Sequence, residues 1–268
     1  MKRLEEKNVL ITGASSGIGQ AIAIRFAKEG ANVAINYRSG AEQAESTRAT
    51  IRANRNGDSH CREIVVQADV SDEQQVKRMF DKVISAFGGV DVLVNNAGIQ
   101  KPMPSHEIET ADFDRVLAVN LRGPFLCARE AIRHFLSRPG GGVILNNSSV
   151  HEIIPKPKYL PYSVSKGGLE NLTKSLALEY ADRKIRVNAV GPGAVVTPIN
   201  KAWINNPKAR HEVESHIPAG RAADADEIAS VFVFLASDDA SYITGQTLFA
   251  CGGLTLYPEF RVAWSSGE

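Results

Sequence analysis

Tyr162 and Lys166 are four residues apart, a spacing that places two side chains on the same face of a helix. An isolated tyrosine has a pKa of about 10 and is a poor base at neutral pH. A nearby ammonium group favours the phenolate, and the positive charge of an oxidised nicotinamide ring would add to this effect. The pair predicts general acid–base chemistry by Tyr162, although an ordinary amphipathic pair at a helix start would have the same spacing.

A glycine-rich segment near the N-terminus indicates where a nucleotide would bind. Gly13, Gly17 and Gly19 lie between the apolar run 9–11 and a stretch whose apolar residues recur at helical spacing. Glycine allows a tight turn and a close approach of a pyrophosphate, and the helix N-terminus supplies free N–H groups. The spacing differs from the fingerprint G-x-G-x-x-G, so a turn without a ligand is the alternative. Together with the tyrosine–lysine pair, this segment predicts hydride transfer coupled to proton transfer.

Residues 36–39, at the end of the second apolar run, bear on the choice of cofactor. An acidic residue there would bind the ribose hydroxyls of NAD and repel the 2′-phosphate of NADP. The segment contains none, and Arg38 offers a guanidinium group suited to a phosphate. We therefore expect NADP to be used, alone or alongside NAD. A solvent-facing arginine is the alternative.

Other polar residues follow later apolar runs. Asp69 could accept a hydrogen bond from the adenine amino group, or it could cap the next helix. The segment 95–98, Asn-Asn-Ala-Gly, follows the fourth run, where a doubly wound sheet binds its ligands. The same four residues also suit a simple turn.

Two further candidates for the chemical step are Ser149 and Asn120. Ser149 lies thirteen residues before Tyr162, and its hydroxyl could hold the reacting oxygen of a substrate. Ser148 is its competitor, and a turn-forming serine is the structural alternative. Asn120 falls within a long predicted helix, where asparagine is unfavourable, so it is expected to mark a local distortion or to hold a water.

Apolar runs alternate with amphipathic stretches along the chain, which predicts an α/β fold whose parallel sheet is covered by helices on both faces. With no linker or repeat, residues 1–268 are expected to form one domain. The long segment 192–218 predicts an ordered lid or binding loop. Strands are expected at 9–11, 32–37, 64–68, 92–94, 143–146 and 186–190 and near residue 248, and helices at 41–56, 112–137 and 162–181 and from about 18, 72 and 224.

The composition narrows the class of protein. The 268 residues are 43% hydrophobic and carry a net charge of +1, so neither nucleic acid nor an anionic membrane is an expected partner. Cys61, Cys127 and Cys251 lack CxxC spacing, which argues against a disulfide framework or a metal site. The N-terminal residues contain no long apolar segment, so we expect a cytoplasmic protein without a signal peptide or membrane span.

The ordered set of motifs resembles that of the short-chain dehydrogenase/reductase family, and the resemblance spans almost the whole chain. It implies a Rossmann-type, doubly wound parallel sheet of about seven strands in a single domain, usually assembled as a homotetramer. The motifs that carry it are Thr12-Gly13-x-x-x-Gly17-Ile18-Gly19, Asn95-Asn96-Ala97-Gly98, Asn120, Ser149, Tyr162-x-x-x-Lys166 and Gly191-Pro192-Gly193.

The resemblance also implies a role for each residue. Tyr162 would be the base in oxidation and the acid in reduction, and Lys166 would lower its pKa and bind the nicotinamide ribose. Ser149 would orient the substrate oxygen, and Asn120 would position a water that links Lys166 to solvent. Thr197 would contact the nicotinamide amide. The cofactor-binding residues expected on this basis are Gly13, Ser15, Ser16, Gly17, Ile18, Gly19, Arg38, Asp69, Val70, Asn96, Ala97, Gly98, Tyr162, Lys166, Pro192, Gly193, Val195 and Thr197.

Within this family, several segments resemble the bacterial glucose 1-dehydrogenases, among them 36–39, 148–152, 197–200, 212–215, 240–242 and 255–258. This implies oxidation of β-D-glucose at C1 to the 1,5-lactone, with NAD or NADP reduced. Gln100, His151 and Asn200, with Ser149 and Tyr162, are the expected sugar contacts. The chain departs from that group at Lys156 and Lys158, where apolar residues are usual, at Cys251 in place of an aspartate, and at Gln100, where a glutamate would fit better.

Two other functions stay open. The same catalytic set would reduce a β-keto acyl thioester or another ketone with NADPH, and a basic surface for an acidic carrier would favour this. A nucleotide-binding regulator without turnover is the non-enzymatic alternative, against which the complete set of Ser149, Tyr162 and Lys166 argues. Phe249, Leu254 and Leu256 are candidate subunit contacts, unless a buried last strand explains them.

Overall fold

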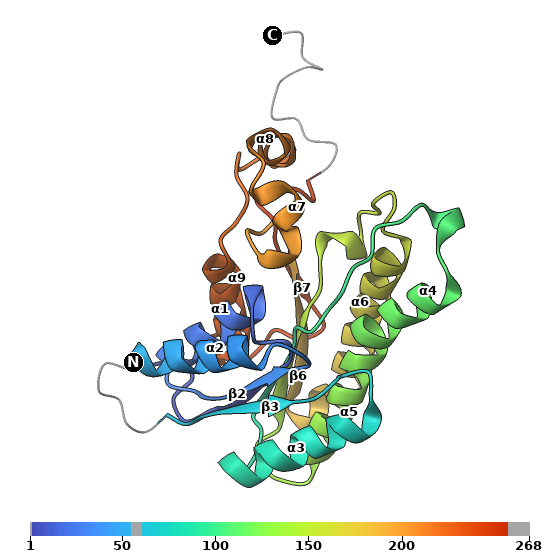
Figure 1. Ribbon diagram of the computed structural model, residues 1–268. Helices are drawn as coiled ribbons and strands as arrows, with labels where there is room; N and C mark the ends of the chain where they lie inside the picture. The colour runs from blue at the N-terminus through green and yellow to red at the C-terminus, as the bar shows by residue number, and fades with distance from the viewer. Residues whose placement is uncertain (1, 55–60, 257–268) are drawn as a thin grey trace.

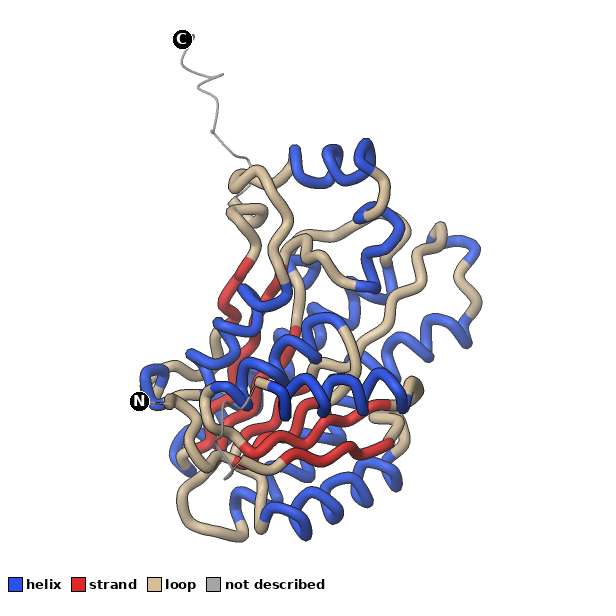
Figure 2. Tube along the Cα trace, turned by 60° about the vertical axis from the view of Figure 1, so that its left-hand side comes forward, coloured by secondary structure: helices blue, strands red, loops and turns tan. Residues whose placement is uncertain are grey.

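The computed structural model describes residues 2–54 and 61–256. Its seven strands form one parallel sheet in the order β3-β2-β1-β4-β5-β6-β7 (Figures 1 and 2). The chain crosses from β3 to the other side of β1 to form β4, so the strand order reverses between β1 and β4, the place where doubly wound sheets bind ligands. The strands are β1 (Asn8–Ile11), β2 (Asn32–Tyr37), β3 (Glu63–Gln67), β4 (Val92–Asn95), β5 (Gly142–Asn147), β6 (Ile185–Pro192) and β7 (Thr247–Ala250).

Helices cover both faces of the sheet because the central strands are apolar on both sides. One apolar core includes Phe26 and Phe232, and the other, across the sheet, includes Phe80 and Phe135. The first face carries α1 (Gly17–Lys28), α2 (Ala41–Ala53) and α9 (Ala225–Ala236), and the second α3 (Glu73–Phe87), α4 (Thr110–Leu117), α5 (Gly123–Leu136) and α6 (Leu160–Tyr180). The expected α/β, Rossmann-type doubly wound fold is confirmed.

The helix expected over 112–137 is interrupted. It begins at Thr110 as α4, passes through a π-helical turn at Ala118–Arg122, and continues as α5 to Leu136. Asn120 lies in the middle of this turn and is buried. A π turn leaves a backbone carbonyl without its usual helical donor, and such turns occur often at functional sites. The distortion expected at Asn120 is therefore present.

Other boundaries differ from the sequence-based expectation. Helix α2 ends at Ala53 and is capped by Asn54. The end expected near residue 56 lies outside the described residues. Segment 192–218 contains two short helices, α7 (Lys201–Ile204) and α8 (Pro207–Ser215), and extends above the sheet in Figure 1. Within residues 2–54 and 61–256, no helix is both long and apolar enough to cross a membrane.

Candidate active site

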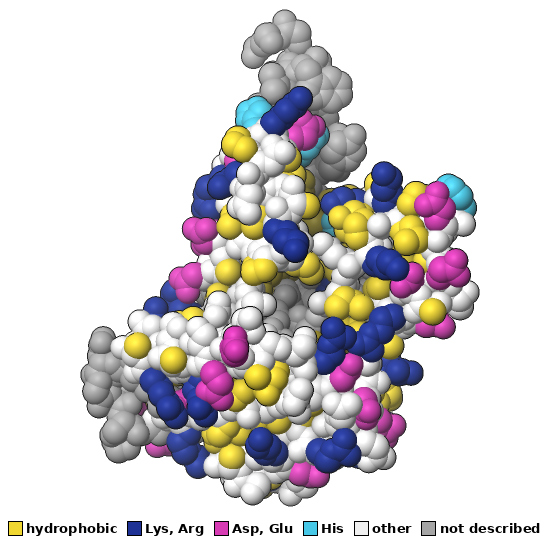
Figure 3. All heavy atoms as spheres, viewed as in Figure 1, with side chains coloured by type: hydrophobic (Ala, Val, Ile, Leu, Met, Phe, Trp, Pro, Cys, Tyr) yellow, Lys and Arg dark blue, Asp and Glu magenta, His cyan; other side chains and the backbone are white. Residues whose placement is uncertain are grey.

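A cavity of about 680 Å³ lies at the carboxyl ends of the central strands. Figure 3 shows the molecule hollowed between the part that carries α7 and α8 and the part that carries α4. Every residue expected to bind cofactor or substrate lines this cavity, from Gly13 to Asn200. Asn120 is not among the lining residues and lies behind the wall. The sheet therefore brings together residues that are nearly two hundred positions apart in the chain.

The glycine-rich turn between β1 and α1 has the form of a phosphate cradle. Gly13 and Gly17 adopt positive φ angles of 62° and 58°, which favour glycine. A Cβ atom at Gly19 would overlap the side-chain amide of Asn96 and the carbonyl oxygen of Gly13. Ser16, the N-cap of α1, makes no side-chain capping bond, so the N–H groups of the first turn still face the cavity without a side-chain partner. These features fit the pyrophosphate of a dinucleotide.

Hydrogen bonds lock this turn to the loop after β4. The Thr12 hydroxyl accepts from the backbone N–H groups of Asn96 and Ala97 at 2.9 and 3.1 Å. The Asn96 side chain donates in return to the carbonyls of Thr12 and Gly13 at 3.0 and 2.9 Å. Segment 95–98 is therefore more than a simple turn, because it fixes the shape of the cradle.

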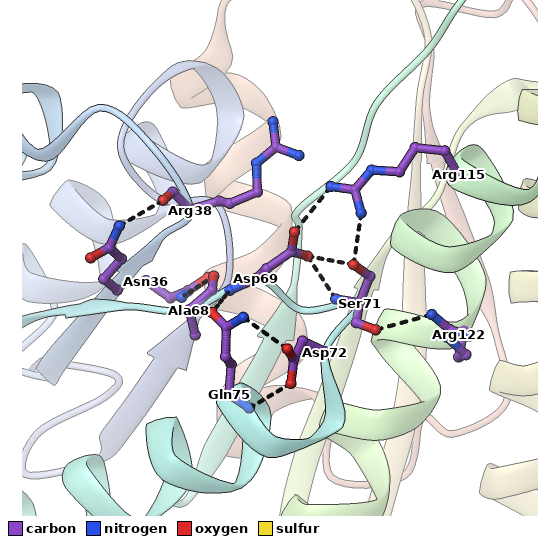
Figure 4. Close-up of polar contacts among 10 residues, drawn as sticks. Asn36, Arg38, Ala68, Asp69, Ser71, Asp72, Gln75, Arg115 and Arg122 are labelled. Carbon is purple, nitrogen blue, oxygen red and sulfur yellow. Dashed lines mark hydrogen bonds and ion pairs between the residues drawn. The ribbon is translucent and has the colours of Figure 1, made fainter. Parts of the chain in front are cut away.

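The other end of the cavity carries the residues expected near the adenosine. Figure 4 shows Arg38 and Arg115 on either side of Asp69. Arg115 donates to the Asp69 carboxylate at 3.0 Å, and the hydroxyl and N–H of Ser71 donate to its other oxygen at 2.6 and 2.9 Å. Burial raises the pKa of Asp69, but the bonds from Ser71 and Arg115 outweigh it and hold this pKa below its usual range. A capping role for Asp69 is wrong, because Asp72 accepts from the first N–H groups of α3.

Three residues of the expected catalytic set meet beneath the loop after β5. Ser149 lies close enough to the Tyr162 side chain for its hydroxyl to act on the phenol and lower its pKa. The Lys166 ammonium lies 5.5 Å from the centroid of the Tyr162 ring and donates to the carbonyl oxygen of Asn147 at 2.7 Å. Ser148, the competing serine, instead donates to the Glu152 carboxylate, so Ser149 is the serine that reaches the tyrosine.

The pKa values of the pair differ from the expectation based on spacing. Burial raises the pKa of Tyr162, although its contact with Ser149 acts in the opposite direction. Burial lowers the pKa of Lys166 to about 8, and the nearby Glu152 carboxylate only partly offsets this. Without cofactor, desolvation therefore outweighs the attraction between ammonium and phenolate. The expected lowering of the Tyr162 pKa therefore stays a prediction for the enzyme with an oxidised nicotinamide bound.

Asn120 connects the loop after β4 to α6. Its side chain accepts from the N–H of Ile99 and donates to the carbonyl of the same residue, both at 2.9 Å. It also donates to the Ser165 hydroxyl at 3.2 Å, and Ser165 donates to the carbonyl of Tyr162 at 2.6 Å. Asn120 thus holds the helical turn that carries the tyrosine.

The residues expected to contact a sugar surround the tyrosine. His151 lies edge-on to Tyr162, with ring centroids 6.1 Å apart, and its Nδ1 is 2.9 Å from the carbonyl of Ile154. Gln100 and Asn200 also line the cavity, but the Asn200 amide donates to the carbonyl of Val195 at 2.9 Å. Asn200 therefore already uses one of its donors to hold the loop.

Sequence reasoning missed two contributors to this site. Arg115 follows Asp69 by 46 positions, and no local pattern pairs the two. The carbonyl of Asn147 holds the Lys166 ammonium, and a backbone carbonyl has no signature in a sequence.

Comparisons with known proteins agree with this geometry. The family model described as enoyl-(acyl carrier protein) reductase matches residues 13–255. The chain is 51% identical to glucose 1-dehydrogenase from Gluconobacter oxydans strain 621H over 264 residues, which are 98% of this chain and 97% of that protein. It is 50% identical to 3beta-hydroxysteroid dehydrogenase 1 from Eggerthella lenta over 258 residues, 96% of this chain and 97% of that protein.

A solved structure adds the cofactor. A candidate 2-deoxy-D-gluconate 3-dehydrogenase from Agrobacterium tumefaciens with bound NADP superposes with a TM-score of 0.86 at 32% identity, covering 94% of this chain and 98% of that one. These likenesses, over nearly the full length, confirm the family that the motifs indicated. The chain therefore belongs to the short-chain dehydrogenase/reductase family and is an NAD(P)-dependent oxidoreductase that acts on CH–OH groups.

Proposed function

We propose that the protein oxidises an aldose at C1, with β-D-glucose converted to D-glucono-1,5-lactone. The observation that carries this proposal is the contact between Ser149 and Tyr162 in a cavity that also presents His151 and Gln100. A sugar needs several directed hydrogen bonds, and an unmatched one in a dry site costs about 1–3 kcal/mol. The likeness to the Gluconobacter glucose 1-dehydrogenase supports this substrate.

In the proposed reaction, Tyr162 accepts the proton of the anomeric hydroxyl while Ser149 holds the same oxygen. A bound nicotinamide supplies the hydride acceptor for C1. Lys166, fixed by the Asn147 carbonyl, keeps its ammonium group 5.5 Å from the centroid of the tyrosine ring. Because burial alone raises the pKa of Tyr162, the tyrosine becomes an effective base only when positive charge is added beside it.

Arg38 supports the use of NADP. It lines the adenosine end of the cavity, and no described residue forms an ion pair or side-chain hydrogen bond with its guanidinium. A free guanidinium can bind a 2′-phosphate through paired hydrogen bonds. We propose NADP as a substrate of this enzyme, alone or alongside NAD.

The test is the initial rate of nicotinamide reduction with D-glucose, other aldoses and polyols, with NAD and NADP compared. Fast turnover of glucose and slow turnover of its epimers is the expected result. Turnover of none of the sugars would contradict the proposal and favour ketone reduction.

Reduction of a β-keto acyl thioester or another ketone is the second candidate. The description of the matching family model, an acyl carrier protein reductase, favours it, and the same catalytic groups work in both directions. NADPH oxidation with acetoacetyl thioesters would distinguish the two. A regulator without turnover is disfavoured, since it has no use for a serine–tyrosine contact inside a nucleotide cavity.

We also propose that segment 192–218 acts as a lid and that the protein is a homotetramer. Trp203 and Val213 of this segment line the cavity, which supports a role in covering the substrate. Of the three apolar residues expected at a subunit contact, only Leu256 is exposed, whereas Leu254 lines the cavity and Phe249 packs against Gly191. A monomer at micromolar concentration in light scattering would contradict the tetramer.

A further inference from the structure

Lys156 stands on the rim of the cavity, in the loop between β5 and α6. The residue as a whole is exposed, but its ammonium group lies 4.2 Å from the centroid of the Tyr159 ring. Tyr159 stacks beside His151 with centroids 6.5 Å apart and meets Tyr162 edge-on at the same distance. All four side chains line the cavity. Lys156 therefore belongs to the wall that surrounds the reacting tyrosine.

The wall around Tyr159 partly desolvates this ammonium group. Desolvation lowers the pKa of Lys156 even though the residue as a whole is exposed. Burial also lowers the pKa of His151, and the charge of Lys156 lowers it further. The cation is thus close to the histidine that is expected to contact the substrate.

No carboxylate of the described residues balances this cation. Asp69 is the only acidic residue among the described residues that line the cavity, and Arg115 and Ser71 already hold it at the adenosine end. Two other cations that line the cavity are already assigned to other groups. Arg38 faces the adenosine end, and Lys166 lies beside Tyr162. Lys156 is left as a partly desolvated charge at the substrate end, in contact with the Tyr159 ring but with no carboxylate partner among the described residues.

Lys158, two residues later, shows that this placement is specific. It is exposed, does not line the cavity, and adopts a φ of 70°. Its carbonyl oxygen accepts from the N–H of Met103 at 2.8 Å, so its backbone anchors the loop. The two lysines look equivalent in the sequence, but only one of them faces the site.

We infer that Lys156 selects substrates by binding an anionic group at the end remote from the reacting carbon, so that the preferred substrate is a sugar that carries a carboxylate or a phosphate. The inference rests on the proposed oxidation of a sugar at this site and narrows its substrate class. An ammonium group that rests on an aromatic ring without a counterion gains most from a partner that brings its own negative charge.

The first test compares three sugars that share the same C1 hemiacetal: D-glucose, D-glucuronate and glucose 6-phosphate. The readout is kcat/KM for each anionic sugar divided by kcat/KM for glucose. The wild type is expected to prefer at least one anion, and Lys156→Met is expected to lower that ratio about tenfold, which corresponds to about 1.4 kcal/mol. Which anion responds distinguishes a carboxylate from a phosphate.

Two further variants control for damage to the loop. Lys156→Arg keeps the charge and should retain most of the preference, whereas Lys158→Met removes an exposed charge and should leave all three rates unchanged. Equal ratios in the wild type and in Lys156→Met would overturn the inference. If the ratio of kcat/KM for the anionic sugar to that for glucose fell equally in Lys156→Met and Lys158→Met, the inference would be overturned too. The effect would then be one of general surface charge.

A binding measurement separates this inference from the proposed function. Titration calorimetry of methyl β-D-glucuronide, whose carboxylate lies at C6 and whose C1 hydroxyl is blocked, into the enzyme saturated with NADP needs no turnover. If no aldose is oxidised but the glucuronide binds about tenfold more weakly to Lys156→Met, the anion site stands and the aldose assignment fails. If glucose is oxidised while Lys156→Met leaves both glucuronide binding and the rate ratios unchanged, only the anion site fails.

Discussion

The ammonium group of Lys166 lies 5.5 Å from the ring centroid of Tyr162 and is held there by the carbonyl oxygen of Asn147. Both side chains are buried deeply enough that desolvation determines their pKa values in the cofactor-free protein. The tyrosine is therefore kept as a phenol until additional positive charge reaches the site. In the proposed reaction, such an arrangement would limit proton abstraction to the enzyme that has already bound its cofactor.

The depressed pKa of Lys166 predicts a pH dependence of stability. The unfolded chain keeps a lysine proton up to a pH of about 10, whereas the folded cofactor-free protein loses it near pH 8. Between these values the unfolded state binds more protons, so the free energy of unfolding rises with pH. We expect this rise to exceed that of Lys166→Met by about 2 kcal/mol between pH 8 and 10.

Urea unfolding at pH 8 and 10, without cofactor, measures this difference. Lys158→Met, which removes an exposed lysine, should follow the wild type. Above a pH of about 10 the trend reverses. The raised pKa of Tyr162 means that the folded state then binds more protons than the unfolded state, so the free energy of unfolding falls as the pH rises. If the free energy of unfolding changed with pH to the same extent in the wild type and in Lys166→Met, the lysine would not be desolvated.

Substitutions of Arg115 and Arg38 are predicted to affect NAD and NADP binding differently. Arg115→Met removes the ion-pair partner that fixes the Asp69 carboxylate. This carboxylate is expected to meet the adenine, a group that NAD and NADP share. We expect Kd to rise about tenfold for both, about 1.4 kcal/mol. Arg38→Asp should weaken NADP much more than NAD, because only NADP carries the 2′-phosphate. Fluorescence titration of NADH and NADPH measures both; an unchanged NADPH affinity in Arg38→Asp would remove Arg38 from the cofactor site.

The phosphate cradle predicts unequal effects for two glycine substitutions. Gly19→Ala forces a methyl group into the Asn96 amide and the Gly13 carbonyl, so cofactor affinity should fall by at least about tenfold. Gly167→Ala, within α6, meets its nearest atom at an ordinary 3.7 Å and should be tolerated, or should stabilise the protein by about 0.4–1 kcal/mol. Cofactor titration and thermal unfolding measure the pair. Wild-type affinity in Gly19→Ala would show that the turn tolerates rearrangement.

Local patterns explain why much of this molecule could be predicted. The glycine turn, the alternation of strands and helices, and the tyrosine and lysine one helical turn apart depend on neighbours in the sequence, so the sequence indicates them directly. The interruption at Asn120 was signalled by a polar residue that is unfavourable in a helix.

Features that depend on tertiary placement could not be predicted. Asp69 and Arg115 come from different parts of the chain, and Asp72, an equally suitable residue, took the capping position. Lys156 and Lys158 differ only through the backbone of one loop. The direction of the tyrosine pKa depends on burial, which spacing does not reveal.

The most direct test of the account compares Tyr162→Phe with the wild type in turnover and in cofactor binding. Phenylalanine keeps the ring against His151 and removes only the hydroxyl that contacts Ser149. We predict that kcat for the oxidised sugar falls at least about 10²-fold, the usual contribution of a general acid–base, while Kd for NADPH changes less than about threefold. Turnover at the wild-type rate would contradict the account, because the tyrosine would then not be the base.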